Sequence, residues 1–274
     1  FCIHYPNTCP NTQTNWKVYF LRRFWRIYPT YFAALILTAS ISYCCYVMWG
    51  DTTWNVKHII RVATLSQNYP PGNGQFLSNP SLWTIPLEVE FYILYPVAFY
   101  LFAKSRIQIL LLITSGLASL SVYLNHQGII WPSFTALFLW PAWLIGAYIA
   151  HMQREKKLNK CNLPLLFLCG GLTLTLALFS RLENWASWIQ YISWTGFYFL
   201  LFIFCLSQPK LLIHVLGNRL FNSISWVGKI SFSLYLIHFP VFKLFGYLHK
   251  EIWNEKPANF LISLAYLVPV FFLG

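Results

Sequence analysis

Residues 27–49 read Ile27-Tyr-Pro-Thr-Tyr-Phe-Ala-Ala-Leu-Ile-Leu-Thr-Ala-Ser-Ile-Ser-Tyr-Cys-Cys-Tyr-Val-Met-Trp49 and contain no charged side chain. A run of this length can cross the roughly 30 Å hydrocarbon core of a bilayer as a helix. Because no water reaches that core, a spanning segment must satisfy its own backbone hydrogen bonds in a helix, or close into a barrel. The apolar residues do not alternate as barrel strands do, so this run predicts a transmembrane helix.

The rest of the chain repeats this pattern in seven further apolar runs: Leu82–Ala103, Ile107–Leu124, Ile130–His151, Leu163–Ser180, Trp188–Ser207, Ile230–Leu248 and Ala258–Leu273. The composition agrees, because 57% of the residues are hydrophobic, 20% aromatic and only 9% charged. Soluble domains carry about 25% charged residues. We therefore predict an all-α, multi-pass transmembrane bundle with eight spans, and treat residues 1–274 as a single integral-membrane domain.

The net charge of +12 would suggest a nucleic-acid partner in a soluble domain, but here the charges lie between apolar runs. With the N-terminus in the cytoplasm, thirteen of the 19 Lys and Arg lie on the cytoplasmic side of the membrane and five lie on the outer side. The remaining one, Lys243, falls within a span. The five outer residues are Lys57, Arg61, Arg181, Lys250 and Lys256. An excess of basic residues on cytoplasmic loops fixes orientation, so topology explains the charge and we expect no nucleic acid.

Two connections are longer than turns. The outer loop from Gly50 to Ser81 carries a Pro/Gly/Asn cluster and is expected to be an irregular loop able to touch a substrate. The inner stretch Pro209–Lys229 mixes apolar and basic residues, as an interfacial amphipathic helix does.

A first polar cluster, Phe20-Leu-Arg-Arg-Phe-Trp-Arg-Ile-Tyr-Pro29, stands at the inner mouth of the first span. On a helix, Arg26 shares a face with Arg22 and Arg23, which lie four and three residues before it. The planar guanidinium binds phosphate with two parallel hydrogen bonds, so the cluster suits the phosphates of coenzyme A. A basic anchor bound to anionic lipid is the alternative interpretation.

A second cluster, Ser81-Leu-Trp-Thr-Ile-Pro-Leu-Glu-Val-Glu-Phe-Tyr-Ile-Leu-Tyr-Pro96, places two carboxylates in what we expect to be the outer part of a span. A charge at the bilayer centre costs about 2.5–3.5 kcal/mol on insertion scales, which calls for a compensating role. Glu88 and Glu90 are about 200° apart around a helix, so they cannot act as one pair. Glu88 shares a face with Tyr92, toward a polar cavity or a neighbouring helix, whereas Glu90 is expected to be structural or interfacial.

A third cluster, Gly228-Lys-Ile-Ser-Phe-Ser-Leu-Tyr-Leu-Ile-His-Phe-Pro240, puts Ser231, Tyr235 and His238 on one polar stripe of an apolar helix. Such a stripe is typical of a helix that faces a site, although an intramembrane His also often only joins helices. Pro240 has no N–H, so the carbonyl of Leu236 lacks its helical donor.

The order and spacing of the three clusters resemble acyltransferase family 3, a family of bacterial membrane-bound acyltransferases. The matching patterns are Arg-x-x-Arg-Ile-x-Pro, then Ser-Leu-Trp-Thr-x-Pro-x-Glu-x-x-Phe-Tyr-x-x-x-Pro, then Ile-Ser-x-Ser-Leu-Tyr-Leu-x-His-x-Pro. The resemblance runs from Phe1 to Lys256. The family bundle has about ten spanning helices, of which about eight are expected here.

The resemblance implies an enzyme of the bacterial inner membrane that takes an acyl group, expected to be acetyl, from cytoplasmic acyl-coenzyme A. The acceptor would be a hydroxyl of a cell-surface or exported carbohydrate. Arg23 and Arg26, with Arg22 beside them, would bind the donor, and Glu88, Tyr235 and His238 match the family's later motifs. Acyl-coenzyme A would be a co-substrate, with no tightly bound cofactor or metal, and membrane lipids would surround the protein.

The start of the chain departs from the family. The essential His of the family lies in a first helix upstream of a Ser-Gly-Phe segment, and Phe1 matches the Phe of that segment. We therefore expect these residues to be a fragment that lacks the first helices and is inactive alone. His4 follows the segment and is not assigned the catalytic role.

Two alternatives come from other functional classes. A multi-pass transporter or flippase for a glycan would use Glu88 and His238 as relay groups, but it predicts an inverted repeat that the sequence does not show. A non-catalytic relative of the acyltransferase fold would bind acyl-coenzyme A without turnover. The sequence does not indicate the oligomeric state.

Overall fold

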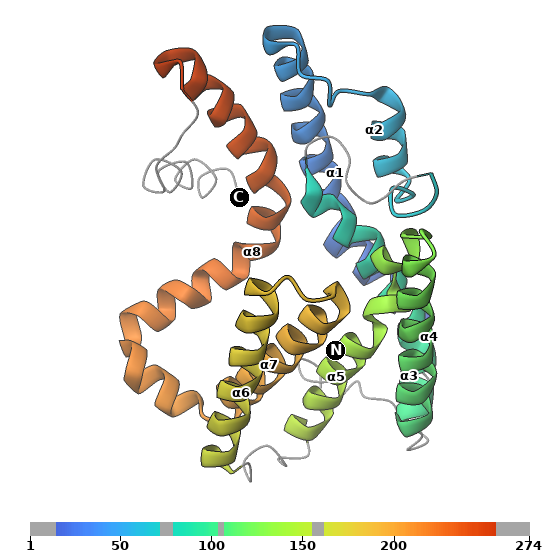
Figure 1. The fold of residues 1–274 in the computed structure, drawn as a ribbon, viewed down its shortest axis with the longest axis vertical. Coiled ribbons are helices and arrows are strands. Elements are labelled where there is room, and N and C mark those ends of the chain that lie inside the picture. Colours follow the sequence, from blue (N-terminus) through green and yellow to red (C-terminus); the bar gives the residue numbers. More distant parts are fainter. Residues whose placement is uncertain (1–14, 72–78, 104–106, 155–161, 256–274) are drawn as a thin grey trace.

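The computed structural model describes residues 15–71, 79–103, 107–154 and 162–255, and over these ranges its regular elements are all helices (Figure 1). In chain order they are α1 (Trp16–Trp49), α2 (Val56–Ala63), the 3₁₀ turn η2 (Pro80–Trp83), α3 (Thr84–Ala103), α4 (Ile107–His126), the 3₁₀ turn η3 (Trp131–Phe134), α5 (Ala136–Arg154), α6 (Leu163–Leu182), α7 (Ser187–Ser207) and α8 (Pro209–Trp253). The predicted all-α class is confirmed.

Seven of the described helices are long and apolar enough to cross a membrane. They correspond to the first seven predicted spans, and the eighth, Ala258–Leu273, lies outside the described residues. Capping residues set the ends of α1. The side chain of Asn15 accepts a hydrogen bond from the N–H of Val18, and Gly50 ends the helix in the left-handed conformation with a φ of 68°.

The last described helix differs from the prediction of an interfacial helix followed by a separate span. Residues 209–253 form one element, α8, whose irregular point is Gly217, with φ 73° and ψ 154°. Glycine adopts this backbone conformation because it has no Cβ. The backbone is therefore irregular inside the predicted interfacial segment, and Figure 1 shows α8 turning again before its upper part, which packs on α1. Figure 1 shows the early part of α8 as an arm that turns away from the other helices.

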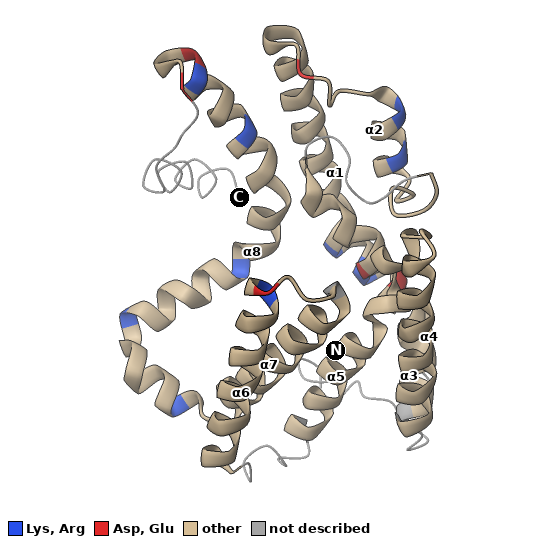
Figure 2. Ribbon diagram, viewed as in Figure 1, with Lys and Arg blue, Asp and Glu red and all other residues tan. Residues whose placement is uncertain are grey.

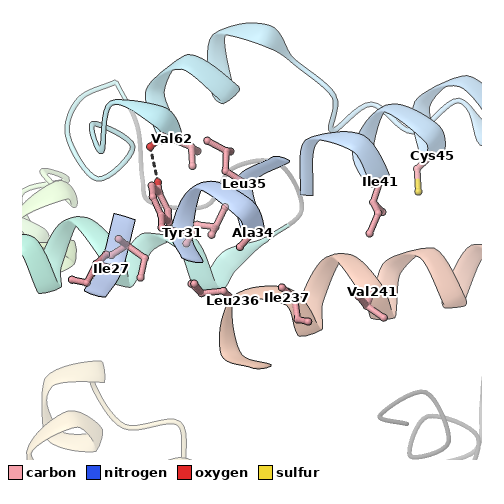
Figure 3. Packing of buried hydrophobic residues seen from close by; sticks show 12 residues of the cluster. Ile27, Tyr31, Ala34, Leu35, Ile41, Cys45, Val62, Leu236, Ile237 and Val241 are labelled. Carbon is pink, nitrogen blue, oxygen red and sulfur yellow. Dashed lines mark hydrogen bonds between the residues drawn. The ribbon is translucent and has the colours of Figure 1, made fainter. Parts of the chain in front are cut away.

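Neighbouring helices pack in pairs, α4 on α5 and α6 on α7, while α1 packs on α8 from the far end of the chain. In Figure 1, α3 to α7 gather in the lower half, and α1, α2 and the last turns of α8 rise above them. The largest buried cluster lies where α1, α2, η2 and α8 meet. Figure 3 shows Leu236, Ile237 and Val241 of α8 facing α1, and Tyr31 of α1 facing α2.

An ion pair joins the segment that follows α1 to the upper part of α8. The Lys243 ammonium contacts the Asp51 carboxylate and donates to the Thr53 hydroxyl at 2.7 Å. Burial raises the pKa of Asp51, but hydrogen bonds from Lys243 and Thr53 and the Lys243 charge outweigh it and hold that pKa below its usual value. The indole of Trp49 donates to Glu251 at 3.0 Å, which adds a second link between the two helices.

Candidate functional site

The arginine cluster lies in the first turns of α1, and its three members differ in exposure. Arg22 and Arg26 are exposed, whereas Arg23 is half-buried. The guanidinium carbon of Arg23 lies 5.4 Å from the ring centre of Tyr19 and 4.9 Å from that of Tyr92. A cation over an aromatic face is attracted by the ring quadrupole. Two rings therefore hold the Arg23 guanidinium between α1 and α3, next to two exposed arginines.

Glu88 lies one helical turn from Tyr92 on α3, and the two side chains are joined. The Tyr92 hydroxyl donates to the Glu88 carboxylate at 2.5 Å, so their predicted shared face is confirmed. Figure 2 shows basic and acidic residues close together where α1 passes α3. Side-chain contacts therefore connect Arg23 to Tyr92 and Tyr92 to Glu88.

This contact relates the level of Glu88, which is predicted in the outer part of a span, to the level of Arg23. Tyr92 lies against Arg23, which the same topology places at the inner mouth, so Glu88 and Arg23 lie at similar levels. The reason is that the outer loop runs back along α1. The Tyr31 hydroxyl donates to the carbonyl of Val62 at 2.6 Å, and α3 consequently starts beside the middle of α1 and not at its end.

Glu90 has a structural position, as expected for the second carboxylate. Its side chain accepts the N–H of Ala136 at 2.6 Å and the hydroxyl of Tyr69 at 2.7 Å. Ala136 is the first residue of α5, so the carboxylate satisfies a free N–H at the positive end of that helix. Burial, together with the nearby Glu90 carboxylate, raises the pKa of the Tyr69 phenol, which therefore stays a donor at neutral pH.

Two buried amides hold the turn that leads into α3. Gln67 donates to the carbonyl of Leu82 at 3.0 Å, and Asn68 donates to the carbonyls of Trp83 at 2.8 Å and Phe134 at 2.7 Å. Sequence reasoning missed both residues, because polar side chains beside a Pro/Gly/Asn cluster resemble any surface loop. Their burial in the structure is the signal that separates them from ordinary loop residues.

The polar stripe predicted on α8 is partly exposed in the structure. Ser231 is exposed and its hydroxyl donates to the carbonyl of Gly228 at 2.9 Å on the same helix. Tyr235 is 39% exposed, and its ring lies 5.8 Å from the half-buried ring of His238. The link from α8 to the other motifs runs through Leu236, which belongs to the same buried cluster as the ring of Tyr92.

The His238 ring has a defined orientation. Its Nδ1 lies 2.8 Å from the carbonyl oxygen of Tyr235 and 3.3 Å from that of Leu234. A carbonyl oxygen can only accept, so these contacts require the proton on Nδ1 and leave Nε2 with its lone pair in the neutral ring. This is the tautomer that a general base needs.

The structure thus joins Arg23 and Glu88 through Tyr92, leaves Arg22 and Arg26 exposed beside them, and places Tyr235 and His238 together on α8. Exposed guanidinium groups next to an ordered one can bind a polyphosphate. Within the described ranges, no three His, Cys, Asp or Glu side chains gather in a way that could hold a metal ion.

In a comparison with protein families, residues 10–274 match a model described as an acyltransferase domain. This match covers nearly the whole chain, including all three motifs. Neither the curated proteins nor the solved structures gave a match.

Proposed function

The chain belongs to acyltransferase family 3, and from this premise we propose that it transfers an acyl group from cytoplasmic acyl-coenzyme A to a carbohydrate hydroxyl. Membership in the family, together with seven described helices able to span a membrane, supports a membrane acyltransferase in general terms. The proposal adds acetyl as the acyl group, a cell-surface or exported glycan as the acceptor and the bacterial inner membrane as the location.

The observation that carries the proposal is the ordered Arg23 with exposed Arg22 and Arg26 around it. An anchor for anionic lipid needs only positive charge, and flexible side chains serve that purpose. Recognition of a pyrophosphate needs guanidinium forks held in fixed directions. The two tyrosine rings restrict Arg23 in this way, which favours a phosphate-bearing co-substrate over a lipid anchor.

The chemistry of the transfer assigns roles to the other site residues. The acceptor oxygen attacks the thioester carbonyl, a base takes the hydroxyl proton, a C–O bond forms, the C–S bond breaks and the coenzyme leaves as a thiolate. By the resemblance the base is the His of the family's first helix, and His238, whose Nε2 carries the lone pair in the neutral ring, is a candidate to accept a hydrogen bond from a substrate. Glu88 orients Tyr92 beneath Arg23, and Tyr235 is the candidate hydrogen-bonding partner of the acceptor.

The experiment is an acyl-transfer assay on membranes that contain the full-length protein, with radiolabelled acetyl-coenzyme A and purified surface glycan. Replacing both Arg23 and Arg26 by Ala should lower kcat/KM for the donor by about 100-fold or more, since hydrogen bonds to charged groups contribute about 1.5–3 kcal/mol each. Lysine at both positions should recover little, because it lacks the planar fork. Full activity with lysine would show that phosphate is not held by arginine forks.

A matched control is Thr175→Ala on α6, where the hydroxyl donates to the carbonyl of Gly171 on its own helix. This variant should leave kcat/KM unchanged. Donor binding by the wild-type protein without turnover on any glycan would instead indicate a non-catalytic relative of the enzyme.

Glu88→Gln tests the carboxylate itself. The amide oxygen can still accept from Tyr92, so the variant removes charge while keeping the contact. If Glu88 holds the Arg23–Tyr92 pair by its charge, KM for the donor should rise about tenfold, since the loss of one charge-assisted hydrogen bond corresponds to about 1–2 kcal/mol. An unchanged KM with unchanged kcat would remove Glu88 from the site.

A further inference from the structure

The helix α8 continues through Pro240, although proline cannot donate the hydrogen bond that the carbonyl of Leu236 needs. Leu236 and Pro240 are both buried, so water does not replace the missing donor. In a membrane protein, an unsatisfied carbonyl is costly, and neighbouring elements usually supply the partner for one freed by proline. The question is which residue supplies it here.

Asn79 supplies it, from the residue just before η2. Its side-chain nitrogen donates to the carbonyl of Leu236 at 2.8 Å and to the hydroxyl of Thr38 on α1 at 3.0 Å. Asn79 and Thr38 are both 0% exposed. Because a carbonyl oxygen only accepts, the contact with Leu236 determines which end of the amide is the nitrogen. One side chain therefore connects α1, the entry to α3 and α8.

These three elements are the ones that carry the proposed site. Arg23 lies on α1, Glu88 lies on α3, and His238 lies in the turn of α8 between Leu236 and Pro240. That turn lacks its own hydrogen bond, so its position relative to α1 and α3 depends on an external donor. Few side chains could replace Asn79, since two N–H groups on one nitrogen must reach two acceptors.

We propose that Asn79 is a positioning residue that replaces the hydrogen bond removed by Pro240 and thereby holds His238 in register with Arg23 and Glu88. Its catalytic meaning rests on the proposed function, whereas the contact itself does not. Asn79 is also the N-cap of η2, where its own carbonyl accepts from the N–H of Leu82 at 3.3 Å. The residue thus fixes both its own turn and the turn on α8.

The test is a double-mutant cycle on the full-length protein in detergent, read by thermal unfolding. Asn79→Ala should lower Tm by about 4 °C or more, as expected for one buried carbonyl that loses its partner. Pro240→Ala gives residue 240 an N–H that reaches the Leu236 carbonyl. In that background, Asn79→Ala should lower Tm by less than half as much.

Asn68→Ala is the matched control, because Asn68 is an equally buried amide that donates to Trp83 and Phe134 instead of α8. Its effect on Tm should be equal in both backgrounds. If Asn79→Ala does not fold, Asn79→Ser, which keeps one donor, takes its place in the cycle. Equal losses for Asn79→Ala or Asn79→Ser with and without Pro240 would overturn the proposed contact.

Kinetics test the positioning role separately. Asn79→Ala should reduce kcat about tenfold and leave KM for the acyl donor within about twofold, because the Arg23 site is not touched. A rise in KM with unchanged kcat would overturn this role. If the wild-type protein transfers no acyl group, the proposed function and the positioning role both fail, whereas the thermal cycle still decides the contact with Leu236.

Discussion

The junction where α1, the outer loop and α8 meet and the α6–α7 pair are both built from long apolar helices, but they are held together differently. In the apolar stretch of α1 that can span a membrane, 33% of the residues are buried, against 11% in the corresponding stretches of α6 and α7. In the junction, hydrogen bonds join residues far apart in sequence, such as Asn79 with Leu236 and Trp49 with Glu251. In α6, hydroxyls such as those of Thr173 and Thr175 donate to carbonyls of their own helix.

This difference shows in which part of the fold the positions of the helices depend on individual contacts. Apolar packing between α6 and α7 tolerates exchanges of similar volume. The junction depends on buried polar groups, and each of those is costly when its partner is lost. The proposed site lies on the side of the molecule where position is controlled most tightly.

The largest effect is expected where the junction holds a charge. Lys243→Ala leaves the Asp51 carboxylate, only 6% exposed, without its cation and should lower the free energy of unfolding by about 3–5 kcal/mol. The measurement is chemical unfolding in detergent. Asp51→Asn combined with Lys243→Met should recover most of this loss, because no buried charge is left unpaired. A loss below about 1 kcal/mol for Lys243→Ala would remove the contrast with the α6–α7 pair.

A smaller effect is expected from Glu90, whose carboxylate accepts the N–H of Ala136 at the start of α5. Glu90→Gln removes the negative charge from a helix N-terminus and should lower the free energy of unfolding by about 1–2 kcal/mol. Glu183→Gln is the matched control, since Glu183 is exposed at the C-terminal end of α6. For the control, the free energy of unfolding measured in detergent should change by less than about 0.5 kcal/mol. Equal effects at the two sites would contradict the assigned role of Glu90.

A core change in the α6–α7 pair should be milder still. Ile203 is one of two residues in the small buried cluster of this region, and Ile203→Val should lower the free energy of unfolding by about 1 kcal/mol. Acyl-donor KM should not change, because the contact lies outside the junction. A donor KM that rises with this substitution would show that the two regions are coupled.

The smallest expected effect is on the pH dependence of stability. The pKa of Asp51 is lower in the folded protein than its usual value, so its contribution is fully present above the usual Asp range near about 4 and is lost as pH falls through the folded pKa. The Tm of the wild type minus that of the Asp51→Asn, Lys243→Met variant should therefore stay constant from neutral pH to about 5 and fall below about pH 4, because only the wild type loses the contribution of the Asp51 carboxylate. A difference that shrinks between pH 8 and pH 6 would implicate another group.

Part of this organisation can be predicted from the sequence because it is local. Apolar runs predict the seven described spans, the i, i+4 spacing predicts the Glu88–Tyr92 pair, and Pro240 predicts an unpaired carbonyl at Leu236. The partners that complete these features lie far away in the chain. Asn79 is 157 residues from Leu236, and no helical or strand period relates such positions.

Two residues show why the rest was missed. Lys243 lies in a predicted span and Asp51 in the predicted outer loop, and nothing in their local sequence indicates that they form an ion pair. The sequence likewise does not indicate that Glu88 and Arg23 lie at similar levels. A loop that runs back along a helix cannot be recognised from loop composition, because contacts such as that between the Tyr31 hydroxyl and the Val62 carbonyl join residues far apart in the sequence.

The length of α1 sets a relation between the protein and the thickness of its bilayer. Its 34 residues extend about 51 Å at 1.5 Å per residue, against a hydrocarbon core of about 30 Å. Even a tilt of 40° would reduce its projection only to about 39 Å, so part of the rod must project from the apolar layer. The end that carries Lys17 and the three arginines is the one suited to the headgroup region. The thickness of the bilayer would then set how far those arginines extend from the membrane into the aqueous phase.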